Sequence, residues 1–322
     1  MTEKIILDCD PGHDDALAMM LAAGNPAIEL LAVTTVAGNQ TVAKVTRNAL
    51  AVCAVAGIDD VPVAMGARLP LVRRQAVAPD IHGDSGLDGP VLPPANRELD
   101  PRHAVDVIIE LVMSHEPDTI TLVPTGPLTN IALAMRTEPR IVERVKQVIL
   151  MGGAYGRGNR TPAAEFNIWA DAEAAAAVFD GGWRRLTMFG LDLTHQATAD
   201  ADVVARIRAI GSDLSDFVGE VLAFFGSTYK KHQGFDAPPV HDPCCVAALI
   251  DPTLVTTREA FVTVETAGRW TYGMTVTDFD DLFGEPRNAF VGTHIDKDRF
   301  WDLIVDAIQR LSDAKASAGR QQ

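Results

Sequence analysis

The chain has 322 residues, of which 47% are hydrophobic, enough for one large domain with a sizeable core. Its formal net charge is −15, so we expect no binding to the phosphate backbone of nucleic acids. No apolar run reaches the roughly 18 residues that a membrane helix needs, so we expect no membrane partner. A small-molecule substrate fits this composition best.

The start of the chain and the cysteines predict the compartment. Met1 runs almost directly into a strand-like segment, so we expect no signal peptide. The four cysteines are Cys9, Cys53, Cys244 and Cys245, and they show no CxxC spacing. We expect reduced, mostly buried thiols in a cytoplasmic protein, with a redox pair at the last two as the alternative.

Strand-like and helix-like patterns alternate through the first two thirds of the chain. The predicted strands are 4–8, 29–35, 61–65, 119–123, 146–151 and 185–190. The predicted helices are 14–23, 40–56, 102–115, 127–136 and 171–180. Several strands are continuous apolar runs, which are typical of a parallel sheet buried on both faces. The alternation predicts a single-domain, doubly wound α/β fold, with a largely parallel sheet flanked by helices.

The last third of the chain adds helices and late strands. We predict a helical block at 200–231, whose apolar stripe from Ile207 to Val221 packs in the core. Three more elements follow: a hairpin or meander at 260–277, a strand at 289–295 and a closing helix at 297–312. No repeat or linker divides the chain, so one domain is expected over 1–312, with a polar, frayed tail at 313–322. The long loops 66–100, 152–169 and 232–241 are expected to be functional or disordered.

The segment from Asp8 to Ala16 reads DCDPGHDDA and is the most informative part of the chain. Asp8 and Asp10 end the first predicted strand. Asp14 and Asp15 fall in the first turn of a helix, where anionic side chains are favoured. Such crowding of like charge is costly unless a cation compensates it, and carboxylate oxygen is the ligand of Ca²⁺ and Mg²⁺. We predict a divalent-metal site, with helix capping and solvated charge as the alternative.

Other polar or glycine-rich segments follow the later strands. They are Thr34 to Asn39, Pro124 to Gly126, Met151 to Gly153 and Gly190 to Asp192. The carboxyl ends of parallel strands meet at one edge of an open α/β sheet, and ligands bind there. The sequence therefore predicts that these segments converge on one site.

Two loops carry further candidate residues. His82 begins the string HGDSG, which is similar to the surroundings of a chymotrypsin-like serine, but the helix–strand alternation excludes that all-β fold. His82 either contacts substrate or lies on the surface. Asn159, Glu165 and Asn167 suit a polyol ligand, because amides and carboxylates pair with hydroxyls, or they form an ordinary polar loop.

Two junctions between loop or strand and helix could complete a metal site. From the residues alone, we expect the segment at Thr125 to cap the following helix, while a backbone carbonyl there that binds Ca²⁺ is the alternative. Asp242 could likewise bind metal or cap the helix that it opens. His241 beside it could act as a general acid near neutral pH, or be structural.

Together these segments resemble the inosine–uridine-preferring nucleoside hydrolase family. The resemblance extends from residue 4 to about 310, and it rests on the aspartate segment, Thr34 to Asn39 and five short strings. These strings are IHGDSG at 81–86, VPTG at 123–126, MGG at 151–153, AEFNI at 164–168 and VHDP at 240–243. The resemblance implies the nucleoside hydrolase fold, with a doubly wound, largely parallel, mixed sheet.

The resemblance also implies roles for individual residues. The implied Ca²⁺ ligands are Asp10, Asp15, the Thr125 carbonyl and Asp242. The implied ribose contacts are Asp14, Asn39, Asn159, Glu165, Asn167 and Asp242. The base would be bordered by His82, Phe166, Phe225 and Tyr229. Asp10 would be the general base, and His241 would protonate or contact the leaving base.

The implied reaction is Ca²⁺-dependent hydrolysis of the N-glycosidic bond of purine and pyrimidine ribonucleosides. Asp10 would activate a metal-bound water, and the ribosyl centre would be oxocarbenium-like and stabilised by nearby carboxylates. Direct attack by water implies inversion at C1′. The family also implies a homotetramer that serves nucleoside salvage.

Several alternatives remain at this stage. The enzyme could be pyrimidine-specific, because Phe225 stands where non-specific members of the family often carry a tyrosine. Asp8 and Asp10 also resemble the DxD motif of haloacid dehalogenase-like phosphatases, although Gly12 and the paired aspartates depart from it. A third possibility is a Ca²⁺-dependent nucleoside-binding protein without catalysis. No Walker A, GxGxxG or HExxH motif supports a nucleotide cofactor or zinc.

Overall fold

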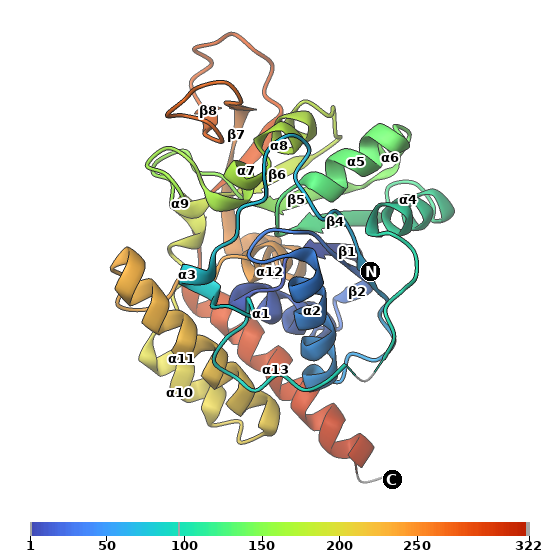
Figure 1. Ribbon diagram of the computed structural model, residues 1–322, viewed down its shortest axis with the longest axis vertical. Helices are drawn as coiled ribbons and strands as arrows, with labels where there is room; N and C mark the ends of the chain where they lie inside the picture. The colour runs from blue at the N-terminus through green and yellow to red at the C-terminus, as the bar shows by residue number, and fades with distance from the viewer. Residues whose placement is uncertain (1, 96, 320–322) are drawn as a thin grey trace.

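A nine-stranded sheet crosses the centre of the molecule and carries helices on both faces (Figure 1). The computed structural model describes residues 2–95 and 97–319. The strand order is β3-β2-β1-β4-β5-β6-β9-β7-β8. The strands from β3 to β9 in this order are parallel, whereas β7 runs antiparallel to both β9 and β8. The predicted doubly wound, largely parallel, mixed α/β sheet is confirmed.

The predicted strands and helices form with small shifts at their ends. The strands are β1 Glu3–Cys9, β2 Ile28–Thr35, β3 Val63–Met65, β4 Ile120–Pro124, β5 Gln147–Met151, β6 Leu186–Phe189, β7 Val255–Val264, β8 Thr275–Asp278 and β9 Ala289–Ile295. The helices of the first half are α1 His13–Gly24, α2 Val42–Ala56, α3 Pro79–His82, α4 Ala104–Ser114, α5 Thr129–Thr137 and α6 Ile141–Arg144. Those of the second half are α7 Phe166–Ala170, α8 Ala172–Phe179, α9 Leu191–Thr194, α10 Ala201–Arg208, α11 Asp213–Gln233, α12 Pro243–Ile250 and α13 Lys297–Gly319, with a 3₁₀ turn at Pro252–Leu254.

The helical block predicted at 200–231 consists of two helices, α10 and α11. Gly211 adopts a φ of 70° between α10 and α11, a left-handed conformation that ends a helix. Ser212 then caps α11, because its hydroxyl accepts the backbone N–H of Ser215. The stripe from Ile207 to Val221 packs in the core as predicted, with Ile210 only partly buried.

The chain end differs from the frayed tail predicted at 313–322. Helix α13 continues to Gly319, so residues 313–319 are helical. The Gln309 amide donates to Asp313 one turn on, at 3.0 Å, and the Lys315 ammonium donates to the Val55 carbonyl at the end of α2. These bonds support the last turns, while residues 320–322 lie outside the described part of the chain.

The segment after β4 does not cap its helix as predicted. Helix α5 begins at Thr129, and Leu128 at its N-cap provides no side-chain bond. The Thr129 hydroxyl donates to Asp171 at 2.6 Å, and the Asn130 amide donates to Asp8 at 2.8 Å. These side chains therefore tie α5 to α8 and to β1 beneath the site.

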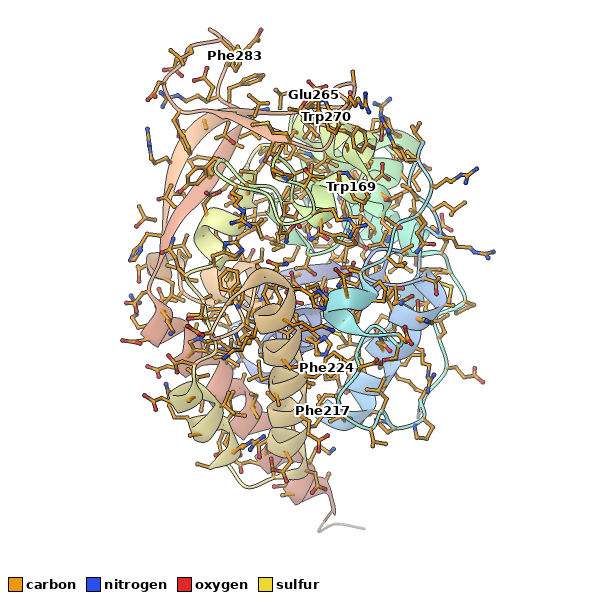
Figure 2. The ribbon with its side chains drawn as sticks, turned by 60° about the vertical axis from the view of Figure 1, so that its left-hand side comes forward. Trp169, Phe217, Phe224, Glu265, Trp270 and Phe283 are labelled. Atoms are coloured by element: carbon orange, nitrogen blue, oxygen red, sulfur yellow. The ribbon has the colours of Figure 1, made fainter. Side chains whose placement is uncertain are left out.

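Two apolar clusters fill the space on either side of the sheet. One joins α1, α2 and α10 to α13, and the other lies under α4, α5 and α8. The four cysteines are buried and unpaired, as predicted. Exposed aromatic side chains such as Trp270 and Phe283 lie at the β7–β8 end, away from Phe217 and Phe224 on α11 (Figure 2). Within residues 2–95 and 97–319, we find no helix that is long and apolar enough to cross a membrane.

Candidate active site

The carboxyl ends of β1, β2, β4 and β5 open into one cavity. The other walls come from α3, the loop before α7, the end of α11 and the start of α12. The predicted site residues on the lining are Asp10, Asp14, Asn39, His82, Thr125, Asn159, Glu165, Phe166, Asn167, Tyr229, His241 and Asp242. The fold thus brings together segments that are more than two hundred residues apart in the chain.

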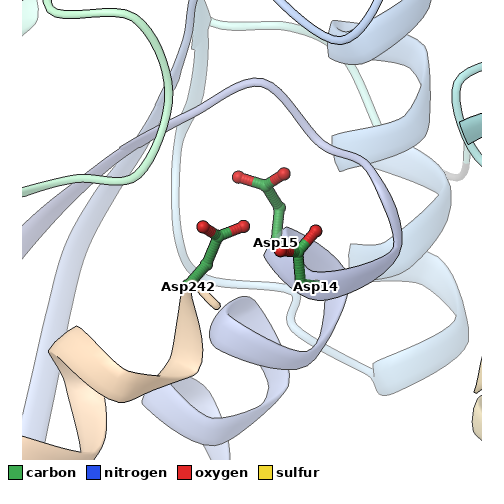
Figure 3. Close-up of side chains that lie close together, drawn as sticks. All are labelled: Asp14, Asp15 and Asp242. Carbon is green, nitrogen blue, oxygen red and sulfur yellow. The ribbon is translucent and has the colours of Figure 1, made fainter. Parts of the chain in front are cut away.

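Three buried carboxylates lie close together at this cavity (Figure 3). Asp14 and Asp242 line it, whereas Asp15 lies behind the lining. Asp14, Asp15 and Asp242 each offer an oxygen, and these oxygens lie within 4.8 Å of one another. Burial and then the charge of Asp15 raise the pKa of Asp14 to about 7. Burial and then Asp14 raise the pKa of Asp242 well above its usual value. Carboxylates this close require bound protons or a cation to compensate their charge.

Asp10 lies beside this group and has one free oxygen. Its Oδ2 accepts the backbone N–H of Asn39 at 2.6 Å, whereas its buried Oδ1 has no hydrogen-bond partner among the described residues. A Cβ atom at Gly38 would stand 2.0 Å from Oδ2, and one at Gly126 would stand 2.7 Å from Oδ1. The two glycines therefore leave just enough room for this carboxylate, whose Oδ1 is available to a cation or a water.

The donor set fits a hard divalent cation, because it consists of oxygen atoms and carries several negative charges. Asp15 is held from both sides, by the backbone N–H of Gly12 and the hydroxyl of Thr125, each at 3.0 Å. The Thr125 carbonyl accepts the Asn167 amide at 2.7 Å and keeps a second lone pair. The carboxylate that lies closest to Asp15 and Asp242 is that of Asp14, rather than that of the predicted ligand Asp10.

Asp8 lies below the cavity and does not line it. Its Oδ1 accepts the Thr34 hydroxyl at 2.6 Å and the Asn130 amide at 2.8 Å. Burial raises the pKa of Asp8 to about 7. A side chain enclosed in this way braces the turn after β1 and is badly placed to attack a phosphate ester.

His241 lies between two hydroxyl groups. The Thr194 Oγ1 is 2.7 Å from its Nδ1, and the Tyr229 hydroxyl oxygen is 2.7 Å from its Nε2. Burial lowers the pKa of His241 well below its usual value and raises that of Tyr229 well above. The neutral imidazole of His241 therefore connects the Thr194 hydroxyl, which does not line the cavity, with the Tyr229 hydroxyl, which does.

His82 is placed by a second histidine. Its Nδ1 lies 3.1 Å from Nδ1 of His13, whose Nε2 donates to the Asp88 carbonyl at 2.8 Å. The ring of His13 stacks on that of Phe225 at 5.0 Å. Phe225 does not reach the cavity surface as predicted, because it packs behind Tyr229 and His82.

Comparisons with known proteins agree with this geometry. The model of the inosine-uridine preferring nucleoside hydrolase family matches residues 5–302. The inosine-uridine preferring nucleoside hydrolase of Crithidia fasciculata is 53% identical over 315 residues, which cover 97% of this chain and 99% of the relative. The pyrimidine-specific ribonucleoside hydrolase RihB of Escherichia coli is 48% identical over 306 residues, covering 95% and 97%.

The chain belongs to the inosine–uridine preferring nucleoside hydrolase family. The structure of a purine-preferring ribonucleoside hydrolase from Gardnerella vaginalis superposes with a TM-score of 0.90 at 33% identity, covering 97% of this chain and all of that one. The fold is therefore the nucleoside hydrolase fold, and the protein is an enzyme that hydrolyses nucleosides. This leaves the phosphatase and the non-catalytic binding protein without support.

In this nucleoside hydrolase the polar loop residues are fixed before any ligand arrives. Glu165 caps α7 by accepting the backbone N–H of Asn167 at 2.8 Å, and it also accepts that of Gly153 at 2.9 Å. Asn159 accepts the backbone N–H of Phe166 at 2.9 Å, which leaves its NH₂ group without a partner among the described residues. Such bonds pre-position the side chains that face the cavity.

Some lining residues of the hydrolase were not predicted from the sequence. They include Asp80, Ile81, Arg160 and Gln233. Gln233 stands four residues after Tyr229 on α11, so helical spacing could have indicated it. His13 lies inside the aspartate motif and could have been noticed there, whereas nothing in the sequence around Thr194 marks its contact with His241.

Proposed function

We propose that this enzyme is a Ca²⁺-dependent hydrolase of inosine- and uridine-type ribonucleosides that acts on both purines and pyrimidines. The observation that carries the proposal is the group of buried carboxylates at the cavity, where Asp10, Asp14 and Asp242 line the same space and Oδ1 of Asp10 has no hydrogen-bond partner among the described residues. The name of the Crithidia relative supports this breadth. The name of the Escherichia coli relative supports a pyrimidine-specific enzyme as the second candidate.

The cation would be held by Asp10, Asp15, the Thr125 carbonyl and Asp242. When bound, Ca²⁺ would offset the crowded charge, engage the 2′ and 3′ hydroxyls of the ribose and lower the pKa of the attacking water. An all-oxygen set favours Ca²⁺ over zinc, which prefers nitrogen and sulfur. Asp14, with its oxygen close to those of Asp15 and Asp242, would contact the ribose from the same side.

Asp10 would act as the general base. Asn39 fixes one oxygen of this carboxylate, so the other can accept a proton from the attacking water without a change of side-chain position. As the C1′–N bond breaks, positive charge develops on the ribosyl centre, and the fixed carboxylates stabilise it. Asn39, Asn159, Glu165 and Asn167 would contact the ribose hydroxyls, and direct attack would invert C1′.

The leaving base would be served by His241 and Tyr229, whose hydrogen-bonded pair lies on the cavity wall. His82 and Phe166 would border the base, with Phe225 supporting them from behind. The phenyl ring at Phe225 lacks the hydroxyl that non-specific family members often carry there. The ratio of kcat/KM for inosine to that for uridine decides between the broad and the pyrimidine-specific enzyme.

We further propose a cytoplasmic homotetramer that serves nucleoside salvage. The four unpaired cysteines support a reducing compartment, and the family resemblance supports the tetramer. Light scattering coupled to size-exclusion chromatography measures the oligomeric state directly.

A reducing-sugar assay on inosine and uridine tests the reaction and the role of Asp10. With Ca²⁺ present, the wild type should release ribose from both substrates, and Asp10→Ala and Asp10→Asn should lose about 10²-fold or more, the usual contribution of a general base. Asp84→Asn, which alters an exposed carboxylate outside the cavity lining, is the control and should stay near wild type. Wild-type rates in Asp10→Asn would show that Asp10 is neither the general base nor a necessary metal ligand.

A further inference from the structure

Thr194 reaches the site from behind. It is the last residue of α9, is fully buried and does not line the cavity. Among the described residues, its hydroxyl has one hydrogen-bond partner, the Nδ1 atom of His241 at 2.7 Å. On the other side of the imidazole, Nε2 has one partner, the hydroxyl of Tyr229 at 2.7 Å. His195 stands edge-on to the His241 ring at 5.8 Å and makes no hydrogen bond to it.

The number of hydrogens on the Thr194 hydroxyl, the His241 ring and the Tyr229 hydroxyl decides which group donates in each of the two hydrogen bonds. A neutral imidazole has one N–H and one bare nitrogen, and each hydroxyl has one hydrogen to give. If Nδ1 carried the hydrogen, Thr194 would accept it, and the Thr194 hydrogen would be buried with no acceptor. Leaving a buried donor unsatisfied is costly.

In the opposite direction, the buried hydroxyl hydrogen of Thr194 has an acceptor. Thr194 donates to Nδ1, so Nε2 carries the hydrogen and donates to the oxygen of Tyr229. The hydroxyl hydrogen of Tyr229 is then the one without a protein acceptor. Tyr229 lines the cavity, so a ligand there can accept this hydrogen.

We propose that Thr194 is a positioning residue that holds His241 in its Nε2–H form, so that Tyr229 presents its hydroxyl hydrogen to the leaving base. This rests on the proposed function, because it assumes that the cavity holds a nucleoside. As the electron pair of the C1′–N bond moves onto the base, Tyr229 donates a hydrogen bond to an acceptor atom of that base. His241 strengthens this donor through the phenol oxygen.

The matched substitutions are Thr194→Val and Thr194→Ser. Valine keeps the shape and removes the hydroxyl, and serine restores the hydroxyl. Thr194→Val should lower kcat for inosine and uridine by about tenfold or more, which is less than the loss of a full acid catalyst, with little change in KM. Nitrophenyl riboside, whose leaving group needs no hydrogen bond, should change by less than about twofold. Thr194→Ser should recover most of the loss.

Two further measurements distinguish positioning from a loss of packing. In a double-mutant cycle, Thr194→Val should add little to Tyr229→Phe, because both act through the same hydroxyl. Thr187→Val, at another buried threonine on β6 outside the cavity lining, should leave the inosine rate unchanged. Fully additive losses, or equal losses on inosine and nitrophenyl riboside, would overturn the proposal.

Nitrogen-15 NMR of the histidine rings reads the tautomer without any substrate. We expect an Nε2–H signal for His241 in the wild type and a shift toward the Nδ1–H form in Thr194→Val. An Nδ1–H signal in the wild type would overturn the proposal even if the enzyme hydrolyses nucleosides. Failure of the wild type to cleave nucleosides would instead reject the proposed function.

Discussion

The aspartates at the end of β1 and the start of α1 differ in the hydrogen bonds that each receives. Asp8 is enclosed by Thr34 and Asn130, and Asp15 by Gly12 and Thr125, so both are held in place. Asp8 and Asp10 each keep one oxygen without a hydrogen-bond partner among the described residues, but only Asp10 lines the cavity. In the proposed reaction, Asp8 would brace the turn, Asp15 would be a fixed ligand and Asp10 the base, while Asp14 lines the cavity.

The raised pKa values of these carboxyl groups predict how stability depends on pH. Burial raises the pKa of Asp14 to about 7, whereas an unfolded aspartate titrates near 4. The folded protein thus binds the proton more tightly than the unfolded chain does. Without metal, this stabilisation is present at low pH and is lost as pH rises from about 4 to about 7.

We predict that Ca²⁺ replaces these protons, so its effect on stability grows with pH. In chelator, the melting temperature should fall between about pH 5 and pH 8, and excess Ca²⁺ should raise it by several degrees at pH 8 but little at pH 5. Scanning fluorimetry at both pH values measures this, with Asp242→Asn as the variant expected to lose most of the Ca²⁺ response. An equal rise of the melting temperature with Ca²⁺ at both pH values would contradict the prediction that Ca²⁺ replaces protons on these carboxylates.

At the scale of elements, α1 is fixed in position by its contact with α13. A Cβ atom at Gly24 would stand 2.6 Å from the carbonyl oxygen of Ala307, closer than any ordinary contact. The close approach of these helices places the first turn of α1, with Asp14 and Asp15, against the start of α12. The helix–helix contact therefore supports the carboxylate group from a distance.

We predict opposite effects for two glycine-to-alanine substitutions in helices. Gly24→Ala should destabilise the protein by about 1–3 kcal/mol, because α13 must shift to admit the methyl group. Gly226→Ala, in the middle of α11 with 3.4 Å to its nearest neighbour, should be neutral or stabilise by up to about 1 kcal/mol. Urea denaturation of both variants provides the comparison, and equal effects would show that the Ala307 contact does not matter.

Much of this element structure could be predicted from the sequence. The apolar runs located the strands from β1 to β6 and the spacing located the long helices, because burial on both faces leaves a strong local pattern. The break at Gly211 and the last turns of α13 were missed, since one glycine among apolar residues and a polar surface helix leave weak patterns. At the site, the motifs indicated the carboxylates and His241. His13 lies within the aspartate motif, but its contact with His82, like that of Thr194 with His241, depends on tertiary packing and could not be assigned.

At the scale of the whole molecule, the sheet topology explains how one cavity is assembled. β1 pairs with β2 on one side and β4 on the other, so the segments after these three strands leave the sheet side by side. Helices α11 and α12, from the last third of the chain, close the same end with Tyr229, His241 and Asp242. Fold and site are thus one arrangement, in which the segments after the parallel strands meet the end of α11 and the start of α12 around the cavity.

Real-time proton NMR of the enzyme with Ca²⁺ and a mixture of inosine and uridine tests the central claim most directly. We predict that the nucleoside H1′ signals disappear while free bases and ribose appear, with the α-anomer of ribose formed first, as inversion at C1′ requires. Both substrates should be consumed, and the chelator should stop the reaction. Unchanged nucleoside signals with Ca²⁺ present would contradict the account.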